Sequence, residues 1–345
     1  RFIIMSDFRI DKITNRDGSA GTQICGVSTF SGTSGMQLPS GPTAYRGGRG
    51  RGFFGSGATP SNTKNLDMIE IATTGNGTDW GDDSVDGRKE GNASFASSTR
   101  GIWAGGYHPS AISGIVYTTM SSSGGVSNFG DLSSARYANA GASDSTRGIS
   151  FGGKTGPSGP QENFIDFVTI ASTGDGTDFG DLTDGASFTG SGINSPTRAI
   201  RTGGTNQSNA SAGNLIDYIT TQTKGDAKNF GDLITKRNSH AGCSNTTRGL
   251  IIAGQNPTNL NSIEYITIAS TGNGTDFGDV NNTVDYLGAC ASSTRGVNAG
   301  GQTPTKINTI EYVTIASTGD ATDFGDLTNT RRFCAGFSDC HGGLG

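Results

Sequence analysis

The stretch N-T-I-E-Y-V-T-I-A-S-T-G-D-A-T-D-F-G-D-L, residues 308–327, recurs in six recognisable copies along this chain of 345 residues. Each copy ends on an aromatic residue followed by Gly-Asp, and these aromatics are Trp80, Phe129, Phe179, Phe230, Phe277 and Phe324. Successive copies are therefore 49, 50, 51, 47 and 47 residues apart. A fixed period of this length indicates a propeller or a solenoid built from one repeated unit.

Each unit has room for four short strands. In the last full unit we predict them at residues 285–292, 296–300, 309–316 and 322–327. The second strand opens on Thr-Arg-Gly, followed by apolar residues and a glycine pair; Ala199 replaces the glycine in one unit, and Arg51 begins a diverged copy. The S-T-G-D/N-G/A-T segment before the fourth strand supplies Gly, Asn and Asp, which tolerate the positive φ of tight turns.

The two ends of the repeat region complement each other. The first unit starts at its second strand, near Arg51, and no first strand precedes it. Residues 331–339, R-R-F-C-A-G-F-S-D, form a spare first strand that aligns with R-Y-A-N-A-G-A-S-D at 136–144. We therefore predict an all-β fold over residues 47–345: a six-bladed β-propeller of four-stranded blades, closed by N- and C-terminal strands in one blade.

Residues 1–46 do not belong to the repeat. They are rich in Gly, Ser and Thr with scattered apolar residues, which is too little hydrophobic surface for a core. We predict an extended arm that attaches the protein to something else. The opening residues R-F-I-I-M-S are too short for a signal peptide.

Composition argues against several classes of partner. The net charge is −5 and no long basic run occurs, so we expect no nucleic-acid partner. No stretch approaches 18 apolar residues, so we expect no membrane insertion. The five cysteines, at 25, 243, 290, 334 and 340, contain no C-x-x-C pair and predict buried free thiols.

Charged residues recur at fixed places in the units. The repeat arginines are Arg100, Arg147, Arg198, Arg248 and Arg295, and the Gly-Asp aspartates include Asp131, Asp181, Asp232, Asp279 and Asp326. A further acid follows the third-strand isoleucine, at Glu70, Asp166, Asp217, Glu264 and Glu311. Because active sites are seldom repeated in every unit, we predict that the arginines form structural ion pairs, partly buried, with one or other set of carboxylates.

No catalytic constellation is visible. The three histidines, His108, His240 and His341, have no His or Cys partner at ligand spacing, and no G-x-S-x-G motif occurs. We expect no enzyme activity, no cofactor and no metal site. Calcium stays open as an alternative, since T-G-N-G-T-D-F-G-D resembles calcium-binding turns but lacks the spacing G-G-x-G-x-D.

The units differ mainly in two sets of loops. The joins between second and third strands vary in length and content, as do the joins between units, and a propeller places both sets on one face. Varied loops on a rigid scaffold are where recognition usually occurs. The candidate recognition residues are Tyr107, His108, Lys154, Gln161, Asn206, Gln207, Asn256 and Gln302.

The repeat resembles the kelch repeat. The resemblance rests on the glycine pairs, on the downstream Tyr117, Tyr218, Tyr265 and Tyr312, on the aromatic before Gly-Asp, and on R-N-S-H-A-G at 237–242. Here twelve residues separate the tyrosine from the aromatic, which is longer than in kelch, and Phe mostly replaces Trp. The resemblance implies a kelch-like propeller.

A second resemblance covers nearly the whole chain. The T-I-A-S-T-G-N-G-T-D-F-G-D repeat, together with I-T-N-R-D-G-S-A-G and S-G-M-Q-L-P-S-G-P in the arm, is similar to tail-fibre-like virion structural proteins of marine cyanobacterial phages. It implies a multicopy, extracellular virion protein that contacts other virion proteins through its arm and a host glycan or protein through its propeller. The alternatives are a secreted lectin-like or scaffolding propeller, a purely structural or decorating virion component, and a propeller enzyme.

Overall fold

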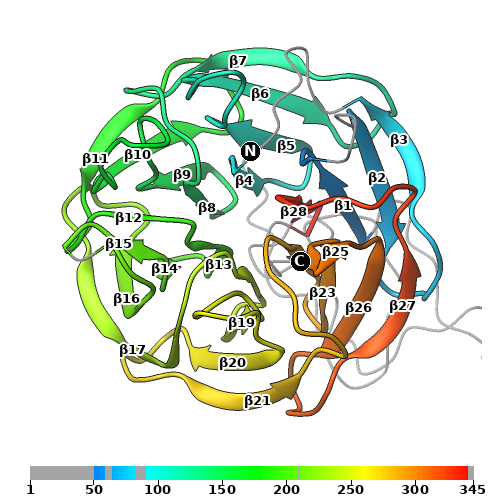
Figure 1. The fold of residues 1–345 in the computed structure, drawn as a ribbon. Coiled ribbons are helices and arrows are strands. Elements are labelled where there is room, and N and C mark those ends of the chain that lie inside the picture. The colour runs from blue at the N-terminus through cyan, green and yellow to red at the C-terminus, as the bar shows by residue number, and fades with distance from the viewer. Residues whose placement is uncertain (1–49, 59–63, 83–90, 209, 341–345) are drawn as a thin grey trace, which may run out of the picture. The chain divides into compact units, whose positions relative to one another are not determined.

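The computed structural model describes residues 50–58, 64–82, 91–208 and 210–340. The regular secondary structure of these residues is β-strand. Six four-stranded antiparallel sheets follow one another around a ring, which makes a six-bladed β-propeller (Figure 1). The fold predicted from the repeat is confirmed. The predicted arm, residues 1–46, lies outside the described residues.

Each blade runs from an inner strand near the axis to an outer strand at the rim. Blade 1 contains, in this order, β28 (Ala335–Ser338), β1 (Arg51–Gly55), β2 (Asn65–Glu70) and β3 (Thr78–Asp82). Blade 2 contains β4 (Ala93–Ala96), β5 (Arg100–Ala104), β6 (Gly114–Thr119) and β7 (Ser127–Asp131). Blade 3 contains β8 (Ala140–Ser143), β9 (Arg147–Phe151), β10 (Phe164–Thr169) and β11 (Thr177–Asp181).

The remaining blades have the same order of strands. Blade 4 contains β13 (Gly190–Asn194), β14 (Arg198–Thr202), β16 (Gly213–Thr220) and β17 (Lys228–Arg237). Blade 5 contains β18 (Ala241–Ser244), β19 (Arg248–Ile252), β20 (Ser262–Thr267) and β21 (Thr275–Asp279). Blade 6 contains β22 (Gly288–Ala291), β23 (Arg295–Ala299), β26 (Thr309–Thr314) and β27 (Thr322–Asp326). Two short ribbons pair β12 (Ala186–Ser187) with β15 (Thr205–Asn206), and β24 (Gln302–Thr303) with β25 (Thr305–Lys306).

The ring closes as predicted, by pairing of the N- and C-terminal strands in one blade. Strand β28 pairs antiparallel with β1, with Phe337 opposite Phe53. Asp339 accepts hydrogen bonds from the backbone N–H groups of Gly50 and Arg51 and forms an ion pair with Arg51 at 3.1 Å. Asp144 accepts equivalent backbone hydrogen bonds at the turn of blade 3, from the N–H groups of Thr146 and Arg147. Two distant chain segments thus reproduce a turn that other blades make within one segment.

Neighbouring blades fit together by size. The second-last residue of each inner strand packs on the residue that follows the repeat arginine in the next blade. A Cβ added at Gly148 would overlap the ring of Phe95, and one at Gly101 would overlap the ring of Phe337. Blade 4 carries Ala199 at this position, and its neighbour there is the small Ala142 in the same hydrophobic cluster. The substitution of Ala for Gly in one unit therefore matches the small side chain that faces it.

We expect Gly148→Ala to lower the free energy of unfolding by about 1–3 kcal/mol, the usual range for overpacking a core. In a background that already carries Phe95→Ala, the same change is expected to have little further effect, because the pair then copies Ala142 and Ala199. Denaturant unfolding of the wild type, the two single variants and the double variant measures this coupling. Additive effects of the two changes would contradict the fit that the structure shows.

The repeat arginines do not form the ion pairs predicted from the sequence. Each lies over an aromatic ring of its own blade, with the guanidinium carbon 4.4–4.8 Å from the ring centroid. Each also donates from Nη1 to a backbone carbonyl beyond the third strand of another blade, at 2.8–3.0 Å. The register explains the difference: Arg147 lies opposite Thr169, whereas Asp166 is three residues away, about 10 Å along the strand.

The Gly-Asp aspartates also have another role. The side chains of Asp131, Asp181, Asp232, Asp279 and Asp326 are exposed. It is their backbone N–H groups that join blades, by donating to Asp or Asn side chains in the turn of the next blade, at Asp175, Asp226, Asn273, Asp320 and Asn76. These interactions tie blades at the rim without burying charge.

Buried ion pairs do occur, and they use other arginines. Three of the predicted third-strand acids take part, in the pairs Arg136–Asp166, Arg201–Asp217 and Arg237–Glu264. In blade 1 the pair is Arg331–Asp67 at 2.7 Å, so the predicted equivalence of Glu70 is wrong by three residues. Glu70 is exposed, while Asp67 lies opposite Asp79 as Asp166 lies opposite Asp178. In blade 6 the buried Glu311 accepts from Asn281 and Asn298.

Candidate functional site

The joins between blades meet at one end of the axis. Each join brings one residue into the left-handed conformation, with φ of 54–58° at Ala138, Phe188, Ser239, Tyr286 and Phe333, and of 54° at Gly91. From Ala138 to Phe333, the N–H of each of these residues donates to the carbonyl of its equivalent in the preceding blade, as in Phe188 to Ala138 and Phe333 to Tyr286, both at 2.8 Å. These residues form what we call the axial ring. Positive φ is unfavourable for side chains larger than Gly, so the ring's hydrogen bonds hold a strained backbone in place.

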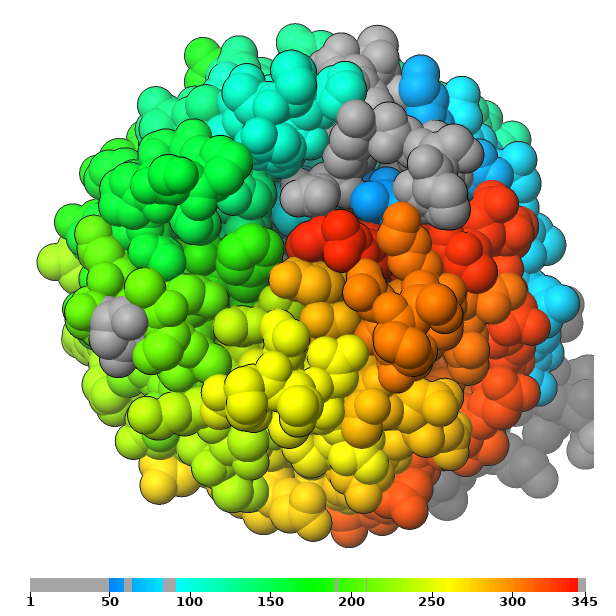
Figure 2. All heavy atoms as spheres, in the orientation of Figure 1, coloured from blue at the N-terminus to red at the C-terminus, as the bar shows by residue number. Residues whose placement is uncertain are grey.

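The predicted sharing of one face by the two varied loop sets is seen directly. Residues of the joins bridge to residues of the loops between second and third strands, as in Tyr137 with Lys154, Asn238 with Gln255, and Asp285 with Gln302. Figure 2, which views the ring along its axis, shows segments from several blades converging on one central region. The axial ring therefore lies on the varied face of the propeller.

Aromatic side chains gather over the axial ring. Phe188, Tyr286 and Phe333 pack together, with ring centroids 4.1 Å apart for Tyr286 and Phe333 and 6.1 Å apart for Phe188 and Tyr286. Tyr137 joins them through Phe188 at 6.2 Å. The guanidinium of Arg332 lies 5.1 Å from the ring centroid of Phe333 and 5.9 Å from that of Tyr286. We call these five residues the axial aromatic cluster; all except Tyr137 are partly exposed.

A pocket of about 70 Å³ lies inside the axial ring. The residues that follow the axial ring line it, and these are Asn92, Asn139, Thr189, His240, Leu287 and Cys334. The Nε2 atom of His240 lies 2.9 Å from Oγ1 of Thr202. Burial, helped by the charges of Arg237 and Arg201, lowers the pKa of His240 to about 3, so the imidazole is neutral at physiological pH. We call this cavity the axial pocket.

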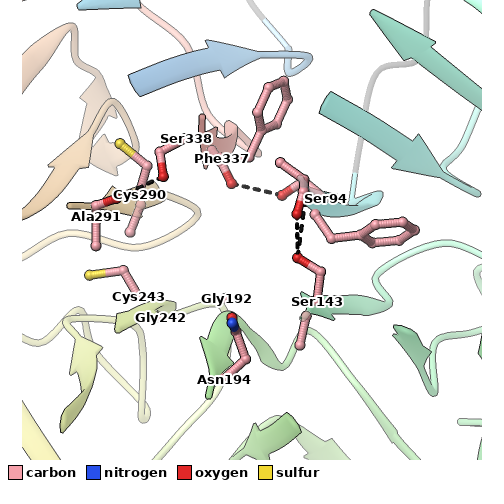
Figure 3. Close-up of a pocket in the computed structure, with 15 residues that line it drawn as sticks. Ser94, Ser143, Gly192, Asn194, Gly242, Cys243, Cys290, Ala291, Phe337 and Ser338 are labelled. Carbon is pink, nitrogen blue, oxygen red and sulfur yellow. Dashed lines mark hydrogen bonds between the residues drawn. The ribbon is translucent and has the colours of Figure 1, made fainter. Parts of the chain in front are cut away.

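Beyond the axial pocket, the inner strands close the axis. They leave a cavity of about 30 Å³, which has room for no more than a few waters. Hydroxyl groups there join neighbouring strands: Ser143 donates to the carbonyl of Ala96 and Ser338 to that of Ala291, both at 2.7 Å (Figure 3). These hydroxyl groups are already bonded and the cavity is less than half the volume of the axial pocket, so a ligand has more room at the axial pocket than deeper along the axis.

Of the predicted recognition residues, two reach the aromatic cluster with their side chains, and Lys154 reaches it through backbone bonds with Tyr137. The ring of Tyr107 packs on Tyr137 at 5.0 Å, and Gln302 accepts a hydrogen bond from Arg332 at 3.0 Å. The others belong to the loops themselves: Lys154 pairs with the buried Gln161, Asn206 with Ala186 in β12–β15, and the backbone N–H groups of His108, Gln207 and Asn256 bond loop carbonyls.

Sequence reasoning missed the centre of this site. The missed residues lie in the joins between blades, and they are Phe188, Tyr286, Phe333 and Arg332. These joins are predicted to vary, but none of the candidate recognition residues comes from them. The signal was available by aligning the units, since the axial-ring position reads Gly91, Ala138, Phe188, Ser239, Tyr286 and Phe333. Because other blades hold Gly, Ala or Ser at this position, the blade fold does not require a large aromatic side chain there. The aromatics in three blades therefore favour a role in binding.

Other chemistry is limited within the described residues. No three His, Cys, Asp or Glu side chains there are placed to hold a metal ion. Cys243, Cys290, Cys334 and Cys340 are buried and form no disulfide, as predicted for these four, and Cys25 lies outside the described residues. Burial raises the pKa of Cys243 to about 12, which suppresses its thiolate. No helix among these residues has the length and apolarity needed to span a membrane.

Comparisons with known proteins leave the family open. The chain matches no protein-family model, and it matches none of the curated proteins with which it was compared.

Proposed function

We propose that this protein is a non-enzymatic recognition propeller of a phage virion, of the tail-fibre or appendage type, whose axial aromatic cluster binds a glycan on the host surface. The observation that carries the recognition role is the gathering of Phe188, Tyr286, Phe333 and Arg332 on the varied face of a rigid ring. Aromatic side chains with a polar partner combine a large apolar contact with orientation by hydrogen bonding. The virion location is supported by the sequence resemblance alone.

The geometry suits a sugar surface. Tyr286 and Phe333 offer aromatic area for the apolar face of a sugar ring, and their rotamers are restricted by mutual packing. Arg332 and Gln302 at the edge supply donors and an acceptor for hydroxyl groups. Such a site is small and its affinity modest, so adhesion would depend on many copies engaging one surface together. This fits the multicopy assembly that the resemblance implies.

We expect Tyr286→Ala to lower retention of the purified protein on host cells by about tenfold or more, the effect typical of an aromatic anchor. Alanine is compatible with the backbone here because Ala138 occupies the equivalent position with φ of 57°. The matched control is Phe164→Ala, which removes a 39% exposed aromatic on β10. Equal retention of the wild type and Tyr286→Ala would remove the axial aromatic cluster from recognition.

The virion assignment needs a separate experiment. Immunogold labelling of purified particles is expected to place the protein on a tail or appendage. Particles carrying a version without residues 1–46 are expected to lose the propeller. If the label is found only on secreted protein, the lectin-like alternative is favoured. If particles are labelled but Tyr286→Ala does not change their adsorption to host cells, a structural or decorating role is favoured.

A further inference from the structure

Four polar side chains are buried around the axial pocket at equivalent positions of four blades. Asn92, Asn139, Thr189 and His240 are only 6%, 4%, 8% and 5% exposed. Each directly follows a residue of the axial ring, and all four residues line the same cavity. Blades 6 and 1 contribute Leu287 and Cys334 at this position.

Each of the four side chains carries one atom that forms no hydrogen bond within the described part of the protein. These atoms are Oδ1 of Asn92, Oδ1 of Asn139, Oγ1 of Thr189 and Nδ1 of His240. Leaving one such buried atom unpaired costs about 1–3 kcal/mol, so four around one cavity indicate a site that something else completes.

The other polar atoms of these side chains are bonded to the protein, which sets the orientation of the free ones. Asn92 donates from Nδ2 to Ser56, and Asn139 donates from Nδ2 to Ser150, both at 2.8 Å. Each amide is therefore left with its oxygen, an acceptor, unbonded in a residue that lines the cavity. A ligand must supply hydrogen-bond donors to these oxygens.

We infer that the axial pocket receives the hydroxyl-bearing edge of a neutral sugar at the end of a glycan chain. This inference rests on the proposed function, of which it names the ligand. Hydroxyl groups can donate to the amide oxygens and can either donate to or accept from Thr189 and His240. Phe188, Tyr286 and Phe333 line the same cavity and offer apolar area to the ring.

The charge and volume of the axial pocket further limit the class of ligand that it can bind. Among the residues that the structure describes, no Asp, Glu, Lys or Arg lines the pocket, so a charged group placed inside it would lose its hydration without gaining an adjacent counter-ion. Arg332 at the rim also disfavours an ammonium. A volume of about 70 Å³ holds ring substituents and not a whole sugar within a continuous chain, which favours a chain end.

The test is binding of free monosaccharides to the full chain. Saturation-transfer NMR titrations would use glucose, galactose and mannose as neutral probes, with glucuronic acid and glucosamine as charged ones. At least one neutral hexose is expected to bind, and the charged sugars are expected to bind about tenfold more weakly or not at all. Tighter binding of glucosamine, or of glucuronic acid through Arg332, would overturn the preference for a neutral ligand.

Thr189→Val tests the pocket with little risk to the fold, because it removes only the unbonded hydroxyl. We expect hexose affinity to fall roughly tenfold while the melting temperature holds or rises. The matched control is Thr118→Val, a buried threonine of β6 at the position where other blades have Val168, Ile219 and Ile266. It is expected to bind like the wild type.

Three results would overturn the inference: no hexose binding at saturating concentration, water alone in the pocket of a hexose-soaked crystal, or equal affinities of Thr189→Val and Thr118→Val. The proposed function has its own readout in cell retention. If Tyr286→Ala loses retention while Thr189→Val binds hexose normally, the aromatic cluster remains a recognition site and the pocket does not. If Tyr286→Ala leaves retention unchanged, the proposed function itself fails.

Discussion

Deletion of residues 331–345 is expected to abolish the cooperative thermal unfolding of the propeller. The deletion removes β28, the inner strand of blade 1, and with it the contacts of β28 with both β22 and β4. It also removes Arg331, which leaves Asp67 buried without its counter-ion. The open ring exposes two apolar blade faces to solvent and leaves one buried charge unpaired. Both changes lower the free energy of unfolding, which is small for most folds.

Calorimetry and circular dichroism on the same samples measure the effect, which appears as loss of a single melting transition. The rescue experiment adds a synthetic peptide with the sequence of residues 331–345 to the truncated protein. Restored cooperativity would show that the strand, and not the covalent link, closes the ring. A truncated protein that melts like the full chain would refute closure through β28.

Arg136→Ala is expected to lower the free energy of unfolding by about 3–5 kcal/mol, the range for breaking a buried pair by removing one partner. Arg136 and Asp166 are both almost fully buried and 2.8 Å apart. Without the guanidinium, the carboxylate keeps only the hydrogen bonds from the backbone and hydroxyl of Ser133. Denaturant unfolding monitored by fluorescence gives the value.

The matched control is Arg147→Ala, which removes a repeat arginine eleven positions later in the same blade. Arg147 is partly exposed and contacts a ring and a carbonyl, so its loss is expected to cost about 1–2 kcal/mol. The double variant Arg136→Leu with Asp166→Val should be more stable than Arg136→Ala, because blade 2 already has Val116 in place of the acid. If Arg136→Ala and Arg147→Ala lower the free energy of unfolding equally, the Arg136–Asp166 pair does not stabilise the blade more than the contacts of Arg147 do.

The varied face was predictable because loop variation shows in the units themselves. The axial aromatic cluster was not predicted, because Phe188, Tyr286 and Phe333 are 98 and 47 residues apart in the chain and each looks like an isolated loop aromatic. Only the ring symmetry, which carries equivalent positions to one axis, brings them into contact. The axial pocket was equally hidden, since Asn92, Asn139 and Thr189 are unremarkable polar residues until their blades meet.

By itself, the sequence determined the architecture of this protein. The six copies of the repeat set the number of blades, and the spare strand at 331–339 set the way in which the ring closes, because both are properties of order along the chain. The tertiary structure alone decided the charge partners: Arg147 looked like the ion-pairing residue, yet register placed Arg136 beside Asp166. It also decided the site. Contacts between residues far apart in the chain depend on blade twist and ring closure, and no local pattern records the distances that these produce.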